Sequence, residues 1–486
     1  YIASPLTLPS GAILKNRIAK SAMSENAGTL SNAPSKTLIN AYKVWAKGNP
    51  GLLITGNVMI DFKAIGEPRN VVVEDYTHFD LLKAWAKTVE GTGVHLWPQL
   101  NHPGRQAFGS INREVVAPSS VPLKMGRVSK MFKLAKPLTE EAILDIIKRF
   151  GNSARIMKEA GFTGCQIHGA HGYLVSQFLS PISNTRTDQW GGPLKNRSRF
   201  VIEVYREIRQ QVGPDYPVGI KINSADFQRG GFTEAESMEV VQFLSREGID
   251  LIEISGGTYE KPAMVKGSRK QSTFEREAYF LDYIEKARKI TDIPLLLTGG
   301  FRSVKIMEDA LAEGKLDVIG LGRPFCLYPN LAQDIFDGKE TCFEAPVPTI
   351  GIKLLDKIGG VELPWYELQI QRLGKGKKPK PNLSGIWAFL FTIREMLLKL
   401  NYRKGLPEGL KILSLKEVQF IGRIQMMSRI FTQIGQKKVS NFILRDMLSH
   451  VVLTTLIQKK NISQRKKKVR KKVLEKVIFP TMVRVL

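Results

Sequence analysis

Eight short apolar runs recur over the first two thirds of the chain and constrain its fold more than any other feature. Each run is continuous rather than alternating, which is typical of strands buried on both faces of a parallel sheet. The runs are Ile18–Met23, Leu52–Thr55, His95–Leu100, Cys165–His168, Val218–Asn223, Leu251–Ile254, Pro294–Thr298 and Val318–Gly322. They predict an α/β fold with eight parallel strands.

Segments with helical periodicity separate most of these runs. They include Glu140–Ala160, Arg197–Val212 and Glu234–Glu247. Thr233 is a plausible N-cap for the third segment, and Glu236 can complete its capping box. Eight strands that alternate with helices over about 300 residues predict a (β/α)₈ TIM barrel. A doubly wound open sheet is the rival fold, but it usually carries a GxGxxG after its first strand, and none is present here.

Barrel enzymes place their chemistry at the C-terminal ends of the strands. The polar residues and glycines at those ends are therefore the candidate functional residues. They are Ser24, Asn57, Gln99, His168, His171, Lys221, Gly299, Gly300, Gly322 and Arg323.

One strand end carries an imidazole, His168, and leads into a loop with a second imidazole, His171, and a phenol, Tyr173. Imidazole N–H groups can donate hydrogen bonds to a developing oxyanion. A phenol with a pKa of about 10 can act as a general acid. Taken alone, such a pair is more often two core or surface histidines, or metal ligands. A metal would need a further carboxylate or His nearby, and the chain has only six His.

The surrounding residues resemble the old yellow enzyme family, also described as NADH:flavin oxidoreductases. The resemblance rests on Ile167–Pro181, Asn184–Asp188, Gly191–Gly192 and Asn196–Arg197, and on Lys15–Arg17, Ser21–Met23, Gln99, His102–Arg105, Thr298–Gly300 and Gly320–Pro324. It covers roughly residues 1 to 395 and weakens after 345. It implies a barrel that holds FMN at its C-terminal mouth, with NADH or NADPH as the reductant. The implied substrate is an α,β-unsaturated carbonyl compound, an enone or enal.

The resemblance also implies a role for His168, His171 and Tyr173, whose segment we call the catalytic loop. His168 and His171 would hold the carbonyl oxygen of the substrate, and Tyr173 would donate a proton. These roles agree with the chemistry of the side chains. Hydride transfer from flavin N5 to the β-carbon moves charge onto the carbonyl oxygen, which two hydrogen-bond donors stabilise.

By the same resemblance, Ala22, Met23 and Ser24 lie along the isoalloxazine edge. Ser24 occupies a position where the family carries a cysteine or threonine that tunes the flavin potential. Its hydroxyl could donate to a flavin oxygen, or it could simply cap the strand end. We also assign Asn57 to the cofactor site.

Gln99 resembles the family glutamine that pairs with the flavin pyrimidine; the alternative is a satisfied amide in the barrel interior. Lys221 stands where the family more often has arginine. A cation there stabilises the anionic reduced flavin, although lysine lacks the planar fork of arginine. The alternative for Lys221 is a salt bridge at the barrel rim.

Loops after the seventh and eighth strands are the recurrent phosphate-binding location of this fold. Here they contain Gly299–Gly300 and Gly322–Arg323. Glycines let backbone N–H groups approach a phosphate, and arginine can contact its oxygens bidentately. We therefore assign Gly300, Gly322 and Arg323 to the cofactor. Because many phosphate-binding barrels share this pattern, a barrel enzyme without flavin is also considered.

The charge divides the chain into three regions: a barrel domain (1–370), a linker that ends the family-like region (371–396), and a basic tail (397–486). The tail has 21 Lys and Arg against four Asp and Glu, so it carries +17 of the net charge of +27. Such a run is usually solvated or disordered. The alternatives are a contact with nucleic acid or anionic membrane, or a non-native extension. A catalytically silent barrel that tethers through this tail is the second functional hypothesis.

The three cysteines, Cys165, Cys326 and Cys342, are widely spaced. This pattern fits a reducing compartment, and we expect a cytoplasmic protein without a disulfide framework or a metal site. Two cysteines near the end of the barrel cannot ligate an iron–sulfur centre, and a second GxGxxG flavin domain is missing. The sequence therefore favours the single-flavin branch of the family, and it leaves open whether the chain forms a homo-oligomer.

Overall fold

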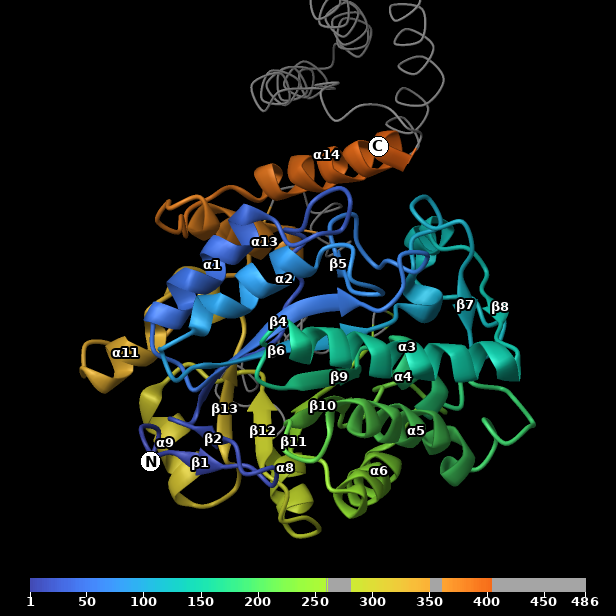
Figure 1. The fold of residues 1–486 in the computed structure, drawn as a ribbon, viewed down its shortest axis with the longest axis horizontal. Coiled ribbons are helices and arrows are strands. Elements are labelled where there is room, and N and C mark those ends of the chain that lie inside the picture. The colour runs from blue at the N-terminus through green and yellow to red at the C-terminus, as the bar shows by residue number, and fades with distance from the viewer. Residues whose placement is uncertain (259, 261–280, 350–360, 404–486) are drawn as a thin grey trace, which may run out of the picture. The chain divides into compact units, whose positions relative to one another are not determined.

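Eight parallel strands close into a barrel, which confirms the (β/α)₈ prediction (Figure 1). The computed structural model describes residues 1–258, 260, 281–349 and 361–403. The strands, in order around the barrel, are β3 (Ile18–Lys20), β4 (Leu52–Met59), β6 (His95–Asn101), β9 (Cys165–Gly169), β10 (Val218–Asn223), β11 (Leu251–Ser255), β12 (Leu295–Thr298) and β13 (Val318–Leu321). The ring closes where Ile319 of β13 pairs with Ile18 of β3.

Helices follow the strands and cover the outside of the barrel (Figure 1). Those up to residue 336 are α1 (Lys36–Lys47), α2 (Phe79–Ala86), α3 (Glu140–Glu159), α4 (Leu174–Leu179), α5 (Leu194–Val212), α6 (Glu234–Glu247), α8 (Leu281–Arg288), α9 (Val304–Ala312), α10 (Arg323–Leu327) and α11 (Leu331–Phe336). The three segments predicted from periodicity are α3, α5 and α6. The predicted capping box of α6 is present, because the Thr233 and Glu236 side chains each bond the other residue's backbone N–H.

Short elements complete the described part of the chain. They are β1 (Leu6–Thr7), β2 (Ile13–Leu14), β5 (Val71–Val72), β7 (Val116–Ala117) and β8 (Lys136–Pro137), with the 3₁₀ turns η1 (Lys87–Val89), η2 (Gly104–Gln106) and η3 (Gly126–Met131). β1 and β2 form an antiparallel hairpin. Among the helices that the structure describes, none is long and apolar enough to cross a membrane.

The interior of the barrel is apolar near the starts of the strands and polar near their ends. Leu251, Trp97 and Leu296 belong to one buried apolar cluster, which Leu8 and Leu14 of the hairpin complete. Alternate residues of a strand point to the same face. Two positions further along these strands stand Glu253, Gln99 and Thr298, which are also buried. The strands therefore form a packed apolar layer at the bottom of the barrel interior and a polar layer above it at the mouth.

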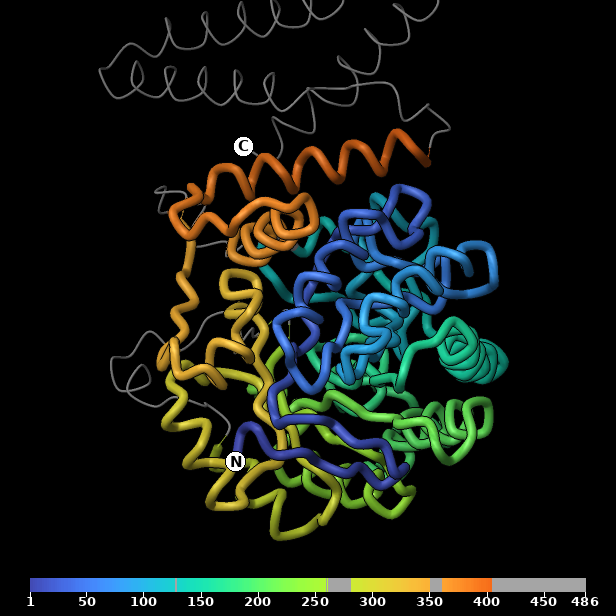
Figure 2. The backbone as a smooth tube through the Cα atoms, turned by 60° about the vertical axis from the view of Figure 1, so that its left-hand side comes forward, coloured from blue at the N-terminus to red at the C-terminus, as the bar shows by residue number. Residues whose placement is uncertain are grey.

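Two further helices, α13 (Glu362–Gly374) and α14 (Gly385–Arg403), follow the last barrel helix. Both views show α14 lying over α13, and α13 packs against α1 (Figure 2). Arg69, in the loop after β4, forms an ion pair with buried Glu395 of α14. The buried amine of Lys399 donates to Leu30 O at 2.7 Å and to Asn32 Oδ1 at 2.6 Å.

The predicted division at residues 396 and 397 falls inside α14, which continues without a break to Arg403. The basic segment 374–381, predicted as a linker, joins α13 to α14. The first compact unit of the chain is Tyr1–Leu406. Residues 404–486, with the predicted contacts to nucleic acid or membrane, lie outside the described residues, so these assignments stay predictions.

The packing of α14 predicts how shortened chains behave. A chain that ends after Leu406 should unfold at the temperature of the full chain. A chain that ends after Ser384 should lose about 3 kcal/mol or more of stability, because the buried side chains Ala388 and Phe391 of α14 lose their packing. Thermal unfolding followed by circular dichroism measures both. Equal melting of the two shortened chains would show that α14 does not stabilise the barrel.

Candidate active site

The structure brings the predicted strand-end residues to one mouth of the barrel. His168 and Lys221 are register partners on β9 and β10. Asn57 and Gln99 are register partners on β4 and β6. Gly300 follows β12, and Gly322 and Arg323 follow β13.

His168, His171 and Tyr173 lie against one another. The ring centroids of His168 and His171 are 5.2 Å apart, and those of His168 and Tyr173 are 4.7 Å apart, both with edge-on geometry. His168 is 3% exposed and Tyr173 is 5% exposed. The short loop between β9 and α4 therefore places two imidazoles and a phenol side by side.

His171 adopts a left-handed backbone conformation with φ 60°, which few residues other than glycine, asparagine, aspartate and histidine adopt. Three contacts hold it there. Its N–H donates to Asn223 Oδ1 at 3.1 Å, and its carbonyl accepts from Gln106 Nε2 at 3.1 Å. Its ring Nε2 lies 2.7 Å from Ser255 Oγ. Ser255 is a site residue that the sequence reasoning missed.

Both rings are held in the neutral state. Burial, followed by the charge of Lys221, lowers the pKa of His171 to about 3. Burial also lowers the pKa of His168 well below its usual range, with smaller contributions from His171 and Lys221. Nδ1 of His168 accepts the N–H of Ala170 at 3.3 Å, so the ring proton of neutral His168 is assigned to Nε2. His168 can therefore donate one hydrogen bond without carrying a charge.

The phenol of Tyr173 receives a long contact of 3.4 Å from Nδ2 of Asn57. Asn57 is oriented in turn by Asn101, whose Nδ2 donates to Asn57 Oδ1 at 3.2 Å. We assigned Asn57 to the cofactor from the sequence. The structure places its amide beside the proposed proton donor.

A chain of buried polar groups crosses the mouth beneath this loop. Gln99 Nε2 donates to Gln166 Oε1 at 2.7 Å, and Gln166 Nε2 donates to Glu253 Oε2 at 2.7 Å. Glu253 also pairs with Lys221 at 2.9 Å and accepts from Thr298 Oγ1 at 2.7 Å. Lys221 therefore forms a salt bridge, but the pair is buried inside the barrel and not at the rim that the alternative supposed. The sequence reasoning missed Glu253, although a charge inside an apolar strand signals such a layer.

The segment Ala22–Ser24 leads away from β3 towards the edge of the mouth. Ala22 packs against the apolar cluster inside the barrel. The sulfur of Met23 lies 3.9 Å from the buried thiol of Cys326. The Ser24 hydroxyl contacts the carboxylates of Glu67 and Glu367, two residues that the sequence reasoning also missed.

The loop after β12 has backbone conformations that favour glycine, and the position after β13 has little room for a side chain. Gly299 and Gly300 have φ of 134° and 93°. At Gly322, an added Cβ would lie 3.1 Å from the side chain of Met23, so this position has little room for a larger residue. Arg323 pairs with Glu362 at 2.6 Å, and its side chain remains 29% exposed. These backbone groups and this cation suit a phosphate, and the amides and Lys221 suit the polar edge of a flavin.

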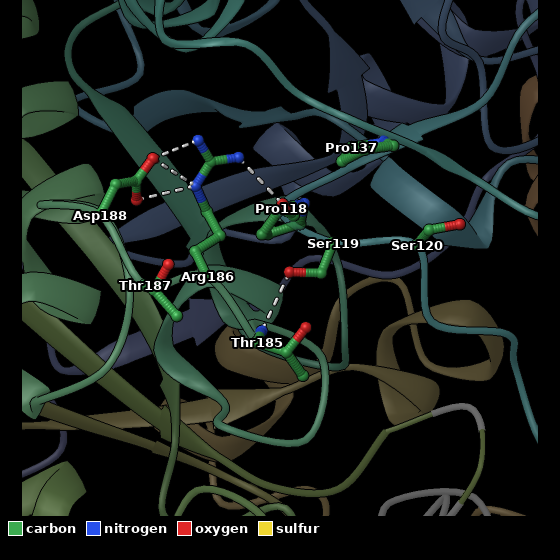
Figure 3. A pocket seen from close by; sticks show the side chains of 8 residues that line it. All are labelled: Pro118, Ser119, Ser120, Pro137, Thr185, Arg186, Thr187 and Asp188. Atoms are coloured by element: carbon green, nitrogen blue, oxygen red, sulfur yellow. Dashed lines mark hydrogen bonds and ion pairs between the residues drawn. The ribbon is translucent and has the colours of Figure 1, made fainter.

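The Asn184–Asp188 motif has a structural role. Figure 3 shows the Arg186 guanidinium between Asp188 and the Pro118 carbonyl. It also donates to the Leu138 carbonyl. These bonds fasten the loop after α4 to the segments around β7 and β8, and a hollow of about 360 Å³ lies between them. None of the predicted catalytic or cofactor residues lines it.

The fold is that of the (β/α)₈ class, whose enzymes carry their chemistry at the C-terminal mouth of the barrel. Within the described ranges, no group of three or more His, Cys, Asp and Glu could hold a metal ion.

Comparison with known proteins makes the assignment specific. Residues 2–341 match the NADH:flavin oxidoreductase / NADH oxidase family. The chain is 36% identical to the NADH-dependent flavin oxidoreductase iliE of Hypocrea jecorina (strain QM6a), over 70% of this chain and 90% of that protein. It is 37% identical to the NADH-dependent flavin oxidoreductase nadA of Aspergillus parasiticus (strain ATCC 56775 / NRRL 5862 / SRRC 143 / SU-1), over 67% of this chain and 76% of that protein.

A solved structure of an old yellow enzyme homologue from Zymomonas mobilis has the same fold. It aligns with a TM-score of 0.59 at 22% identity, over 70% of this chain and 94% of that chain. The chain belongs to the NADH:flavin oxidoreductase family of the old yellow enzyme type. The cofactor of this family is FMN, and its reductant is NADH or NADPH.

The lowered pKa of His171 makes stability depend on pH. His171 has a pKa of about 3 in the folded chain, against 6.5 for an ordinary histidine side chain. The unfolded chain therefore binds the extra proton first, and the free energy of unfolding should fall as pH drops from about 6.5 to about 3. In His171→Gln this fall should be smaller, by an amount on the order of a few kcal/mol. Urea unfolding at several pH values measures it, and parallel curves for the two proteins would contradict the assignment.

Proposed function

We propose that the chain is an ene-reductase, which uses NADH or NADPH to reduce the carbon–carbon double bond of an α,β-unsaturated carbonyl compound. The observation that carries this proposal is the contact between His168, His171 and Tyr173 at the mouth. Two neutral imidazoles and a phenol offer hydrogen-bond donors and a transferable proton in one place. Reduction of a polarised alkene by hydride transfer needs the donors at the carbonyl oxygen and the proton for the α-carbon.

The histidine pair binds the substrate through its carbonyl oxygen. FMN, when bound, supplies the hydride that it has received from the nicotinamide. His168 donates from Nε2, and His171 can donate when Ser255 satisfies its other nitrogen. Because the rings are buried and fixed, they need little reorganisation as charge grows on the oxygen. Loss of one such donor typically slows a reaction by about 10²–10³-fold.

Tyr173 completes the reduction by delivering a proton to the α-carbon. Its ring packs edge-on against His168, and Asn57 lies beside its hydroxyl. These contacts hold the phenol near the carbonyl-binding pair. The side chain acts as a general acid, a role that typically contributes about 10²–10⁴-fold to the rate.

The residues at the mouth include groups of the kinds that FMN requires. Gln99 and Lys221 would hold the polar edge of the ring, and Ala22, Met23 and Ser24 would line its other edge. Gly300, Gly322 and Arg323 would hold the phosphate. Since Lys221 already pairs with Glu253, this lysine brings less net positive charge to the flavin than an unpaired cation would.

The purified full chain tests this proposal directly. It should carry or take up about one FMN and show a flavin absorbance band. Anaerobic NADH or NADPH should bleach this band, and an enone or enal should restore it. His171→Gln should slow the restoration, whereas His78→Gln, which alters a histidine on another loop, should not. A folded protein that takes up no FMN, or a reduced flavin that no enone or enal reoxidises, would contradict the proposal.

Tyr173→Phe separates the two half-reactions. The phenol is needed only when the alkene accepts a proton, so substrate reduction should slow by about 10²-fold or more. Reduction of the flavin by NADH or NADPH should change little. Stopped-flow absorbance measures each half-reaction alone. An equal loss in both would mean that Tyr173 shapes the site rather than donates the proton.

A further inference from the structure

A buried cluster outside the catalytic loop joins three distant parts of the chain. Ser24 follows β3, Glu67 lies between β4 and β5, and Glu367 stands on α13. Ser24 Oγ contacts Glu67 Oε1 and lies 2.8 Å from Glu367 Oε1. Glu67 is 9% exposed and Glu367 is 3% exposed. One hydroxyl therefore bridges two buried carboxyl groups.

The other contacts of the two carboxyl groups are neutral. Asn70 Nδ2 donates to Glu67 Oε2 at 3.2 Å, and Asn26 Nδ2 donates to Glu367 Oε2 at 3.2 Å. In the part of the chain that the structure describes, neither glutamate forms an ion pair with Lys, Arg or His. Two ionised carboxylates in this position would carry two buried negative charges without a cation.

The charged groups that face the cluster do not supply the missing positive charge. Glu25 faces Glu67, and Glu395 faces Glu367, and each of these neighbours raises the pKa of the carboxyl group that it faces. The cations nearby are already engaged with these neighbours. Lys20 pairs with Glu25 at 3.2 Å, while Arg69 and Arg394 pair with Glu395.

Both hydrogen bonds to Ser24 can form only if one of the two carboxyl groups is protonated. The Ser24 hydroxyl has one proton and can donate it to only one carboxylate. The second contact needs a proton from the other carboxyl group, which then donates to Ser24 Oγ. Burial, and then the charge of Glu67, raises the pKa of Glu367 to about 8. Burial also raises the pKa of Glu67.

We propose that Glu67 and Glu367 share one proton across Ser24 at neutral pH and thereby fix the direction of the Ser24 hydroxyl beside the flavin. The second half of this inference rests on the proposed function, which places Ser24 along the flavin edge. The hydroxyl proton is committed to a carboxylate, so Ser24 presents an oxygen lone pair rather than a donor to its surroundings. Glu67 and Glu367 are positioning residues that act through Ser24.

The shared proton also links the flavin environment to pH. Above the titration of the pair, the proton leaves to solvent and the cluster gains one negative charge. A negative charge near the flavin disfavours its anionic reduced form, so the reduction potential should fall more steeply with pH in that range. This effect depends on the carboxyl pair and not on the catalytic loop.

Infrared spectroscopy of the full-length chain tests the shared proton without any turnover. The spectrum should contain a protonated-carboxyl band that disappears as pH rises through about 8. In Glu67→Gln and in Glu367→Gln this titration should move to lower pH, because one carboxylate is gone. The double variant should lack the band. Asp250→Asn, which alters a buried carboxylate paired with Arg209, should leave the titration in place.

Ser24→Ala provides a second route if the glutamine variants do not fold. It keeps both carboxyl groups but removes two hydrogen bonds from the singly protonated pair and only one from the deprotonated pair, so the titration should move to lower pH. Absence of a protonated-carboxyl band at neutral pH in the wild-type chain would overturn the shared proton. A titration that none of these cluster variants moves would overturn it equally.

The link to the flavin has its own measurement. The midpoint potential of the FMN-loaded chain, recorded against pH, should bend where the infrared band titrates, and the bend should be absent in Glu367→Gln. An infrared titration without this bend would overturn the role beside the flavin. Failure of the chain to bind FMN would overturn that role together with the proposed function, while the infrared result would still decide the shared proton.

Discussion

The Lys221–Glu253 ion pair in the barrel interior is the contact on which the mouth depends. A buried charge is unfavourable unless it is paired and hydrogen-bonded. Glu253 meets this need through Lys221, Gln166 and Thr298, which stand on three other strands. Gln166 then fixes Gln99 on β6. One carboxylate on β11 thus sets the positions of side chains on four other strands of the barrel. The charge of Lys221 also helps to keep the two histidines neutral.

Much of the barrel could be predicted from the sequence because a parallel strand that is buried on both faces has a continuous apolar sequence. The helices with clear periodicity and a capping box were predicted for a similar local reason. The catalytic loop was equally accessible, since His168, His171 and Tyr173 stand within six residues of one another. Their roles remain a prediction, and the structure adds the geometry that supports it.

The contacts that were missed join residues far apart in the chain. Ser24 and Glu367 are separated by 343 positions, and no periodicity relates them. The region from 371 to 396 was taken for a linker because it is basic and contains Pro and Gly, yet α14 begins within it and buries Glu395. Glu253 was the one missed residue with a visible signal, a charge between Ile252 and Ile254. A rule that treats such a charge as part of an interior layer would have found it.

The closure of the barrel also governs the order in which the chain can fold as it is synthesised. β3 needs β13 as a neighbour, so residues 18–20 wait for residues 319–321 to leave the ribosome. Leu30 and Asn32 can form their hydrogen bonds with Lys399 only after that residue has been synthesised. Long-range pairing of this kind slows folding and leaves strand edges exposed in the meantime. The nascent barrel therefore keeps unpaired strand edges exposed until β13 and Lys399 have been synthesised.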